Sequence, residues 1–151
     1  MKYTTEIVVD VPREEFIKIM DDPENMKHWQ DGLIGYEQLS KNPNQDGAQM
    51  SLSYKMGKGE MKLVETIMKR NLPHELFMTY DAKGVHNIQR NYFKEEEGDK
   101  TRWVSESEFQ FSGFGMKLMG FFMPGAFKKQ SLKYMQDFKT FAETGKSVTD
   151  S

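Results

Sequence analysis

The sequence predicts an α+β domain in which one curved antiparallel sheet of about seven strands wraps around a long C-terminal helix. Two observations lead to this prediction. Apolar and polar residues alternate with a period of two through much of the chain before Ser112, which is typical of strands. After Gly113 the period changes to 3.6, which predicts an amphipathic helix. A one-sided sheet and such a helix bury their apolar faces by packing against each other.

The first expected elements are one strand and two short helices. The segment YTTEIVVDV alternates and is rich in β-branched residues, so we expect a strand from about Tyr3 to Val11. Pro12 ends this strand and favours the first turn of a helix, REEFIKIM, which has acidic residues near its start. Asp22 and Pro23 open a second short helix that ends near Gly32.

Six further strands are expected before Ser112. The segment AQMSLSYKM alternates strictly, with its Met, Leu and Tyr residues on one face. We expect a tight turn at Lys58-Gly59 that leads into EMKLVETIMKR and places Leu52 opposite Glu65. This register keeps the apolar sides of the two strands together, as one buried face requires.

The last two strands are expected to form a hairpin around the loop EEEGDK. Pairing Phe93 with Trp103 places Arg90 opposite Glu106, which is a favourable cross-strand charge pair. The same register gives the other face aromatic ends and an uncharged polar middle. The residues of this less charged face are Asn87, Gln89, Asn91, Phe93, Trp103, Ser105, Ser107 and Phe109.

The long helix is expected to end at Thr144-Gly145, and Pro124 separates it from the apolar segment 114–123. Lys129 and Glu143 belong to its polar side. Its apolar face consists of Phe127, Ser131, Tyr134, Met135, Phe138, Phe141 and Ala142. We expect a single domain over residues 1–145, followed by a polar C-terminal tail over residues 146–151.

Composition excludes several classes of function. The net charge is −2 and the basic residues are spread along the chain, so no nucleic-acid partner is expected. The chain has no cysteine and therefore no disulfide or thiolate chemistry. The longest uncharged stretch, Leu118–Phe127, is much shorter than the roughly 20 residues of a membrane span, so no integral membrane association is expected. The N-terminus has no signal-peptide pattern, and we expect a cytoplasmic protein.

The order of one strand, two short helices, six strands and one long helix resembles the START/birch-pollen-allergen superfamily (SRPBCC; polyketide cyclase/dehydrase and lipid transport). The segments that carry the resemblance are IVVDVPREEFIKIMDDPENMKHW, GDKTRWVSESEF and KKQSLKYMQDFKTFAE. They mark a fold, called the helix-grip, and contain no chemical signature; the likeness is greatest to uncharacterised bacterial members. The resemblance implies a cavity between sheet and long helix that holds a lipid, sterol, polyketide or other hydrophobic molecule.

The residues themselves fit such a cavity. Twelve Met and eleven Phe supply bulky, adaptable apolar side chains, although the same side chains can simply fill a core. The polar middle of the inward face favours a cavity, because a dry core would leave its groups without hydrogen-bond partners. The expected ligand-binding residues are Trp29, Tyr54, Leu63, Tyr80, Asn87, Gln89, Asn91, Trp103, Phe121, Phe122, Tyr134 and Phe138.

No catalytic motif is present. Glu65 shares a face with apolar neighbours, where burial would raise its pKa and suit it to general acid or base chemistry. The alternative is an acid near a sheet edge that is paired with a Lys. The three His residues have no metal-ligand spacing and no glycine-rich segment has dinucleotide-loop spacing, so neither a metal nor a cofactor is expected.

Three functions remain open from the sequence. The first is the binding of a hydrophobic small molecule or lipid, for transport or sequestration. The second is an enzyme of cyclase, dehydratase or hydrolase type that uses Glu65 or a Tyr. The third is a stress or chaperone-cofactor role, in which the Phe-rich segment 118–127 binds a protein partner instead of lining the cavity.

Overall fold

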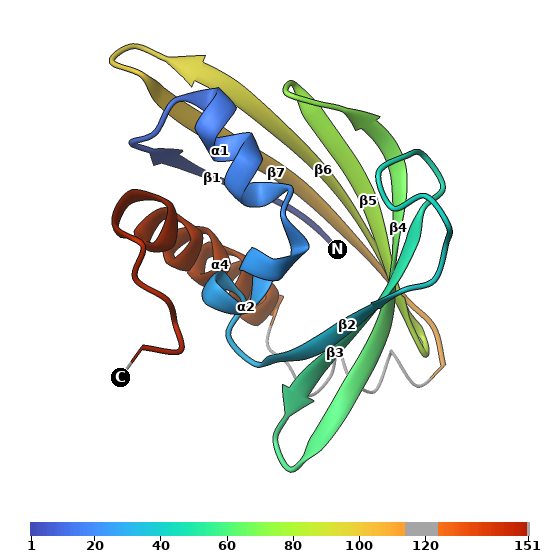
Figure 1. The fold of residues 1–151 in the computed structure, drawn as a ribbon. Coiled ribbons are helices and arrows are strands. Elements are labelled where there is room, and N and C mark those ends of the chain that lie inside the picture. Colours follow the sequence, from blue (N-terminus) through green and yellow to red (C-terminus); the bar gives the residue numbers. More distant parts are fainter. Residues whose placement is uncertain (114–123, 151) are drawn as a thin grey trace.

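The computed structural model describes residues 1–113 and 124–150 and confirms the expected architecture. A seven-stranded antiparallel sheet curves around the long C-terminal helix, and two short helices follow the first strand (Figure 1). The elements are β1 (Lys2–Val9), α1 (Arg13–Met20), η1 (Pro23–Asn25), α2 (Met26–Trp29), β2 (Leu33–Gln38), β3 (Gln49–Met56), β4 (Gly59–Asn71), β5 (Glu75–Ala82), β6 (Val85–Glu96), β7 (Lys100–Phe111) and α4 (Pro124–Thr144).

The sheet order is β1-β7-β6-β5-β4-β3-β2, so the first strand pairs with the last. Strands β2 to β7 form successive antiparallel pairs, and β1 joins the free edge of β7. Helices α1, α2 and α4 all lie on the concave side of the curved sheet (Figure 1). This arrangement leaves an interior bounded by strands on one side and by α4 on the other.

The register of the β6–β7 hairpin is as expected. Phe93 lies opposite Trp103, and Arg90 lies opposite Glu106. The loop that joins the strands contains Gly98 and Asp99, both with positive φ, a conformation that glycine adopts without steric cost and that Asp tolerates better than most residues. The polar middle of the inward face therefore points into the interior.

The register expected for β3–β4 was wrong by two residues. Met56 lies opposite Gly59, so the two-residue turn consists of Gly57 and Lys58, and Leu52 lies opposite Leu63. A two-residue hairpin turn needs a positive φ in its loop, and Gly57 supplies it with φ of 58°. Because side chains alternate with a period of two, a shift of two residues leaves every side chain on the face expected for it.

The core fills the end of the interior nearest α1. Phe138 of α4 is completely buried, and its ring centroid lies 4.8 Å from Phe16, 5.2 Å from Trp29 and 5.5 Å from Trp103. Phe16 also packs against Phe93, at 5.3 Å. These aromatic contacts, together with Met135, hold α1, α2 and α4 on the sheet.

Glu143 lies on the polar side of α4, but it also makes hydrogen bonds that were not expected from the sequence. Its carboxylate accepts hydrogen bonds from the backbone N–H of Asp10 (2.7 Å) and from Lys139 Nζ (2.5 Å). Lys139 Nζ also donates to the carbonyl oxygen of Val8, at 2.9 Å. The end of α4 is therefore fastened to the end of β1. Burial alone would raise the pKa of Glu143, but these hydrogen bonds outweigh it and the pKa is lowered.

We expect Glu143→Gln to lower the free energy of unfolding by about 1 kcal/mol at pH 7. A carboxylate whose pKa is lower in the folded protein stabilises it above the unfolded pKa, about 4.3, and this stabilisation disappears as the pH falls through the folded pKa. Urea denaturation should therefore show a larger difference from the parent at pH 7 than at pH 3.5. The exposed Glu97→Gln is the control; a difference of the same size at both pH values would contradict the assignment.

The C-terminal residues pack on α2. Ser147 is buried, and its hydroxyl lies 2.9 Å from His28 Nδ1. The N–H of Val148 donates to the carbonyl oxygen of His28, at 3.0 Å. The ring of His28 stacks on Phe141 of α4, at 4.9 Å. Residues 146–150 thus run back along the outside of the short helix.

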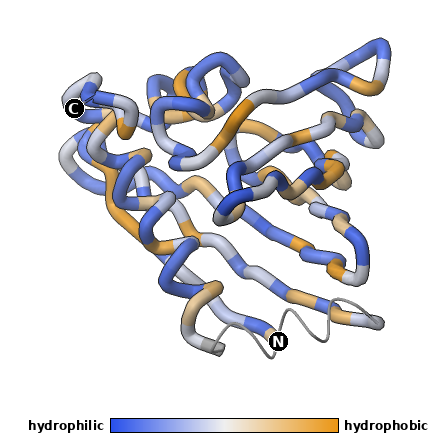
Figure 2. The backbone as a smooth tube through the Cα atoms, turned by 90° about the horizontal axis from the view of Figure 1, so that it is seen from below, coloured by the Kyte–Doolittle hydropathy of each residue, from blue (hydrophilic) through white to orange (hydrophobic). Residues whose placement is uncertain are grey.

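No helix among residues 1–113 and 124–150 is long and apolar enough to cross a membrane. In Figure 2 hydrophobic and hydrophilic residues alternate in short segments along the described chain, without a long hydrophobic run. The Phe-rich segment 118–127 is described only from Pro124 onward. Phe127, in the first turns of α4, packs against Phe109 (4.8 Å) and Phe111 (5.8 Å) of β7.

Candidate functional site

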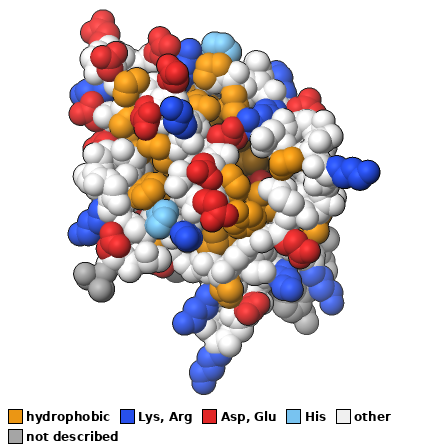
Figure 3. Space-filling view, in the orientation of Figure 1, with side chains coloured by type: hydrophobic (Ala, Val, Ile, Leu, Met, Phe, Trp, Pro, Cys, Tyr) orange, Lys and Arg blue, Asp and Glu red, His pale blue; other side chains and the backbone are white. Residues whose placement is uncertain are grey.

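A cavity of about 1090 Å³ lies between the concave face of the sheet and the first half of α4. It begins where the aromatic core ends: Trp103 and Phe93 belong to both, and the lining then continues along β7 to Phe111 and along α4 to Phe127. The cavity is open to solvent. Figure 3 shows hydrophobic side chains in a hollow on this face of the molecule.

The wall of the cavity is mainly apolar because the strands turn alternate residues inward. Much of this wall is thioether and aromatic surface from the sheet and α4, and Met fills irregular space and adapts to varied apolar shapes. The methionines that line the cavity are Met20, Met56, Met61, Met78 and Met135.

The polar middle of the inward face is largely satisfied within the protein. Asn87 Nδ2 donates to Ser107 Oγ (2.9 Å), and Gln89 Nε2 donates to Asn87 Oδ1 (2.9 Å). Asn91 Nδ2 donates to the carbonyl oxygen of Leu76 (3.2 Å) and Asn91 Oδ1 accepts from Trp103 Nε1 (3.0 Å). The expectation that these groups would lack partners in the absence of a ligand was therefore wrong, although their inward orientation was right.

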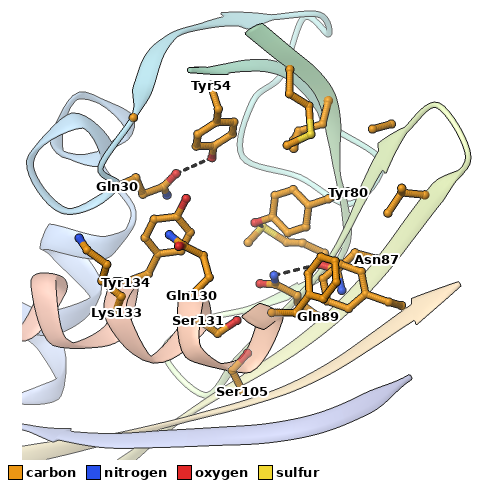
Figure 4. Close-up of a pocket in the computed structure, with 18 of the residues that line it drawn as sticks. Gln30, Tyr54, Tyr80, Asn87, Gln89, Ser105, Gln130, Ser131, Lys133 and Tyr134 are labelled. Atoms are coloured by element: carbon orange, nitrogen blue, oxygen red, sulfur yellow. Dashed lines mark hydrogen bonds between the residues drawn. The ribbon is translucent and has the colours of Figure 1, made fainter. Parts of the chain in front are cut away.

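Three tyrosine hydroxyls point into the cavity from different elements (Figure 4). Tyr54 of β3 donates to Gln30 Oε1 at 2.5 Å. Tyr80 of β5 donates to the sulfur of Met78 at 3.7 Å, a weak acceptor, and Tyr134 projects from α4. Burial raises the pKa of all three hydroxyls, so each stays protonated at neutral pH and serves as a hydrogen-bond donor.

Glu65 lies on the inward face of β4, directly opposite Tyr80 of β5 and Met50 of β3. Burial raises the pKa of the Glu65 carboxyl, and the nearby polar hydroxyl of Tyr80 opposes this shift. Glu65 itself is not part of the cavity lining. Its cross-strand neighbour Tyr80, an adjacent residue of the same face, does line the cavity.

Two buried polar atoms next to the cavity are left unpaired in the described part of the chain. They are Thr5 Oγ1 of β1 and Trp29 Nε1 of α2, and both residues line the cavity. Leaving a buried donor or acceptor without a partner costs about 1–3 kcal/mol. Trp29 was expected to line the cavity. Thr5 was not, because the alternation of residues on β1 does not indicate that this edge strand borders the cavity.

Nine of the twelve expected ligand-binding residues line the cavity: Trp29, Tyr54, Leu63, Tyr80, Asn87, Gln89, Asn91, Trp103 and Tyr134. Phe138 lies in the core instead, because its ring fills the space between Phe16, Trp29 and Trp103. Phe121 and Phe122 fall outside the described residues. Gln30 and Gln130 also line the cavity, although no pattern in the sequence marks either residue.

No group of three or more metal-ligating side chains that could hold a metal ion occurs in residues 1–113 and 124–150. The His residues of this part of the chain have other contacts. His28 lies beside Ser147, His86 beside Asp81, and His74 within 3.4 Å of Arg13.

No protein-family model and no curated protein matches this chain. Solved structures match it along nearly its whole length. Ara h 8.0201 matches with a TM-score of 0.75 at 10% identity, covering 95% of this chain and 98% of its own. The Zhui aromatase/cyclase from Streptomyces sp. R1128 has a TM-score of 0.76 at 12% identity, with coverage of 95% and 93%. A point mutant of norcoclaurine synthase from Thalictrum flavum has a TM-score of 0.68 at 11% identity, with coverage of 96% and 95%.

At these identities the likeness concerns the fold. The helix-grip fold that the resemblance implied is confirmed, because the matches extend over both the sheet and α4. An aromatase/cyclase and a norcoclaurine synthase are thus among the proteins that share this fold.

Proposed function

We propose that this helix-grip protein binds a hydrophobic small molecule or lipid in the cavity between its sheet and α4. The observation that carries the proposal is the cavity itself: about 1090 Å³ of open space with mainly apolar walls. Small-molecule sites occupy roughly 300–1,000 Å³ and have a few polar groups that fix orientation. A dry core of the same composition would instead be packed nearly without voids.

Burial of the ligand's apolar surface supplies the driving force. Each 100 Å² of apolar surface removed from water contributes at most about 2.5 kcal/mol, from which the cost of immobilising the ligand must be subtracted. The methionine-rich wall adapts to the ligand's shape and so favours a class of molecules over one compound. The polar groups then decide how the ligand is oriented.

Native mass spectrometry of the purified protein tests the proposal. We expect a fraction of the protein to carry a bound apolar molecule that is released on denaturation. Titration with a fluorescent apolar compound should also show saturable binding at one site. Absence of both co-purified and added ligand would contradict the proposal.

Tyr80 is the residue that we expect to orient the ligand. Its hydroxyl points into the cavity, and its hydrogen bond to a thioether is weak enough to be exchanged for one to a ligand oxygen. We expect Tyr80→Phe to weaken the binding of a carbonyl-bearing apolar ligand by about 3- to 10-fold, the value of one hydrogen bond, and to leave the folded protein's stability nearly unchanged.

The matched control is Tyr92→Phe. Tyr92 belongs to β6, but its hydroxyl donates to Glu106 on the opposite side of the sheet, at 3.2 Å, and the residue does not line the cavity. Isothermal titration calorimetry on both variants separates the two positions. Equal affinities for Tyr80→Phe and the parent would show that this hydroxyl does not contact the ligand.

A second candidate function is acid–base catalysis on a hydrophobic substrate, and the pairing of Glu65 with Tyr80 favours it. A carboxyl group with a raised pKa suits proton transfer near neutral pH, and its cross-strand neighbour Tyr80 lines the cavity. Glu65→Gln separates the two functions, because a binding protein should retain its ligand affinity while a catalyst should lose turnover.

A further inference from the structure

We propose that the cavity selects uncharged ligands: molecules whose buried polar group is a hydroxyl or a carbonyl, and not a carboxylate or an ammonium. This inference rests on the proposed binding function and narrows it to a ligand class. It follows from where the charged and the uncharged polar residues of the lining lie.

Every charged residue that lines the cavity within the described part of the chain is exposed to solvent. These residues are Asp31, Lys55, Glu60, Lys62, Lys83 and Lys133. Two of them already have partners of opposite charge: Lys133 Nζ lies 3.5 Å from Asp31 and 2.7 Å from Asp137. The charges therefore form a rim in water, where salt and solvent screen them.

The few polar groups of the interior are uncharged. Its hydrogen-bonding groups are amides and hydroxyls, and several bind one another, as Asn87 and Gln89 do. A ligand ion inside would meet dipoles and aromatic rings but no described buried residue of opposite charge.

Burial also disfavours the charged form of the ionisable groups nearest the interior. Burial raises the pKa of Glu65, as it raises that of Tyr54, Tyr80 and Tyr134, which shows that these surroundings disfavour negative charge. An anionic ligand placed among them would suffer the same loss of hydration. A cationic ligand would have to be met by an ionised Glu65, which lies next to Tyr80 on the same face of the sheet but outside the lining.

The cost of burying an unpaired ion exceeds that of burying a hydroxyl, which can be hydrogen-bonded by an amide or a tyrosine. We therefore expect an uncharged ligand to bind at least about 10-fold more tightly than an ion of the same shape. In a compound that tests this expectation, the ionic group must be attached close to a rigid ring system. Otherwise a flexible chain would carry it to the rim.

Three anthracene derivatives test this inference: 9-anthracenemethanol, 9-anthracenecarboxylate and 9-(aminomethyl)anthracene as its ammonium ion. Their dissociation constants are measured by fluorescence at pH 7.5 with the parent protein, with Glu65→Gln and with Glu60→Gln. Glu60→Gln is the matched control, because it makes the same chemical change at the exposed rim.

We expect the alcohol to bind at least 10-fold more tightly than either ion, and Glu65→Gln to change its affinity by less than about 3-fold. A carboxylate affinity within 3-fold of that of the alcohol would overturn the inference while the binding function stands. An ammonium ion that binds most tightly and depends on Glu65 would overturn it too, since Glu65 would then be an ionised counterion. Failure of all three compounds to bind would overturn the binding function and this inference together.

Discussion

Replacing Phe138 by Ala is expected to lower the free energy of unfolding by about 3–5 kcal/mol, which is a large part of the stability of a domain this size. Phe138 is completely buried, and its ring contacts Phe16 of α1, Trp29 of α2 and Trp103 of β7. Truncation removes the apolar surface of the ring and leaves a void among rigid aromatic neighbours. These neighbours cannot close over the void without losing their own edge-on contacts.

Urea denaturation of Phe138→Ala measures this loss. Lys129→Ala is the matched control on the exposed side of the same helix and should change the free energy of unfolding by less than about 0.5 kcal/mol. If Phe138→Ala were no more destabilising than Lys129→Ala, the aromatic cluster would not be what holds α4 on the sheet. Glu143 is unsuitable as this control, because it fastens α4 to β1.

The sequence predicted the register of two paired strands only where particular residue pairs are favourable in one alignment and not in the alternatives. In the β6–β7 hairpin the charge pair Arg90–Glu106 and the aromatic pair Phe93–Trp103 coincide in a single alignment, and that alignment is found. In β3–β4 the apolar residues recur at every second position, so registers that differ by two residues bury the same face. The turn decides between them, and either Gly57 or Gly59 would have allowed a tight turn.

For the candidate site, the sequence predicted which face a residue occupies but not which partners its side chain binds. Alternation placed Asn87, Gln89 and Asn91 on the inward face, but it does not reveal which side chains bind each other across neighbouring strands. Helical periodicity placed both Phe127 and Phe138 toward the sheet. It does not tell which turn of α4 faces the core and which faces the cavity, because that depends on where the aromatic rings of α1 and α2 end.

Asn91 shows how a side chain in the cavity wall can be principally structural. It is 4% exposed, donates to the carbonyl oxygen of Leu76 on β5 and accepts from Trp103 Nε1 on β7, so one amide joins three strands. Asn91→Leu keeps the volume but removes both hydrogen bonds. We expect it to lower the free energy of unfolding by about 2–4 kcal/mol, because the indole N–H and the carbonyl group lose these bonds in a buried place.

A double-mutant cycle with Trp103→Phe separates the lost hydrogen bond from the change in packing. Removing both partners also removes the unpaired N–H, and replacing a buried pair by apolar groups costs less than breaking it from one side. We therefore expect Asn91→Leu with Trp103→Phe to be at least about 1 kcal/mol less destabilising than the sum of the single variants in urea denaturation. Strict additivity would mean that the contact of 3.0 Å between Trp103 Nε1 and Asn91 Oδ1 contributes little, and that this amide oxygen is free to bind a ligand. Coupling of the expected size would instead show that Asn91 is used in hydrogen bonds within the sheet. The orientation of a ligand would then depend on Tyr80 and its neighbours.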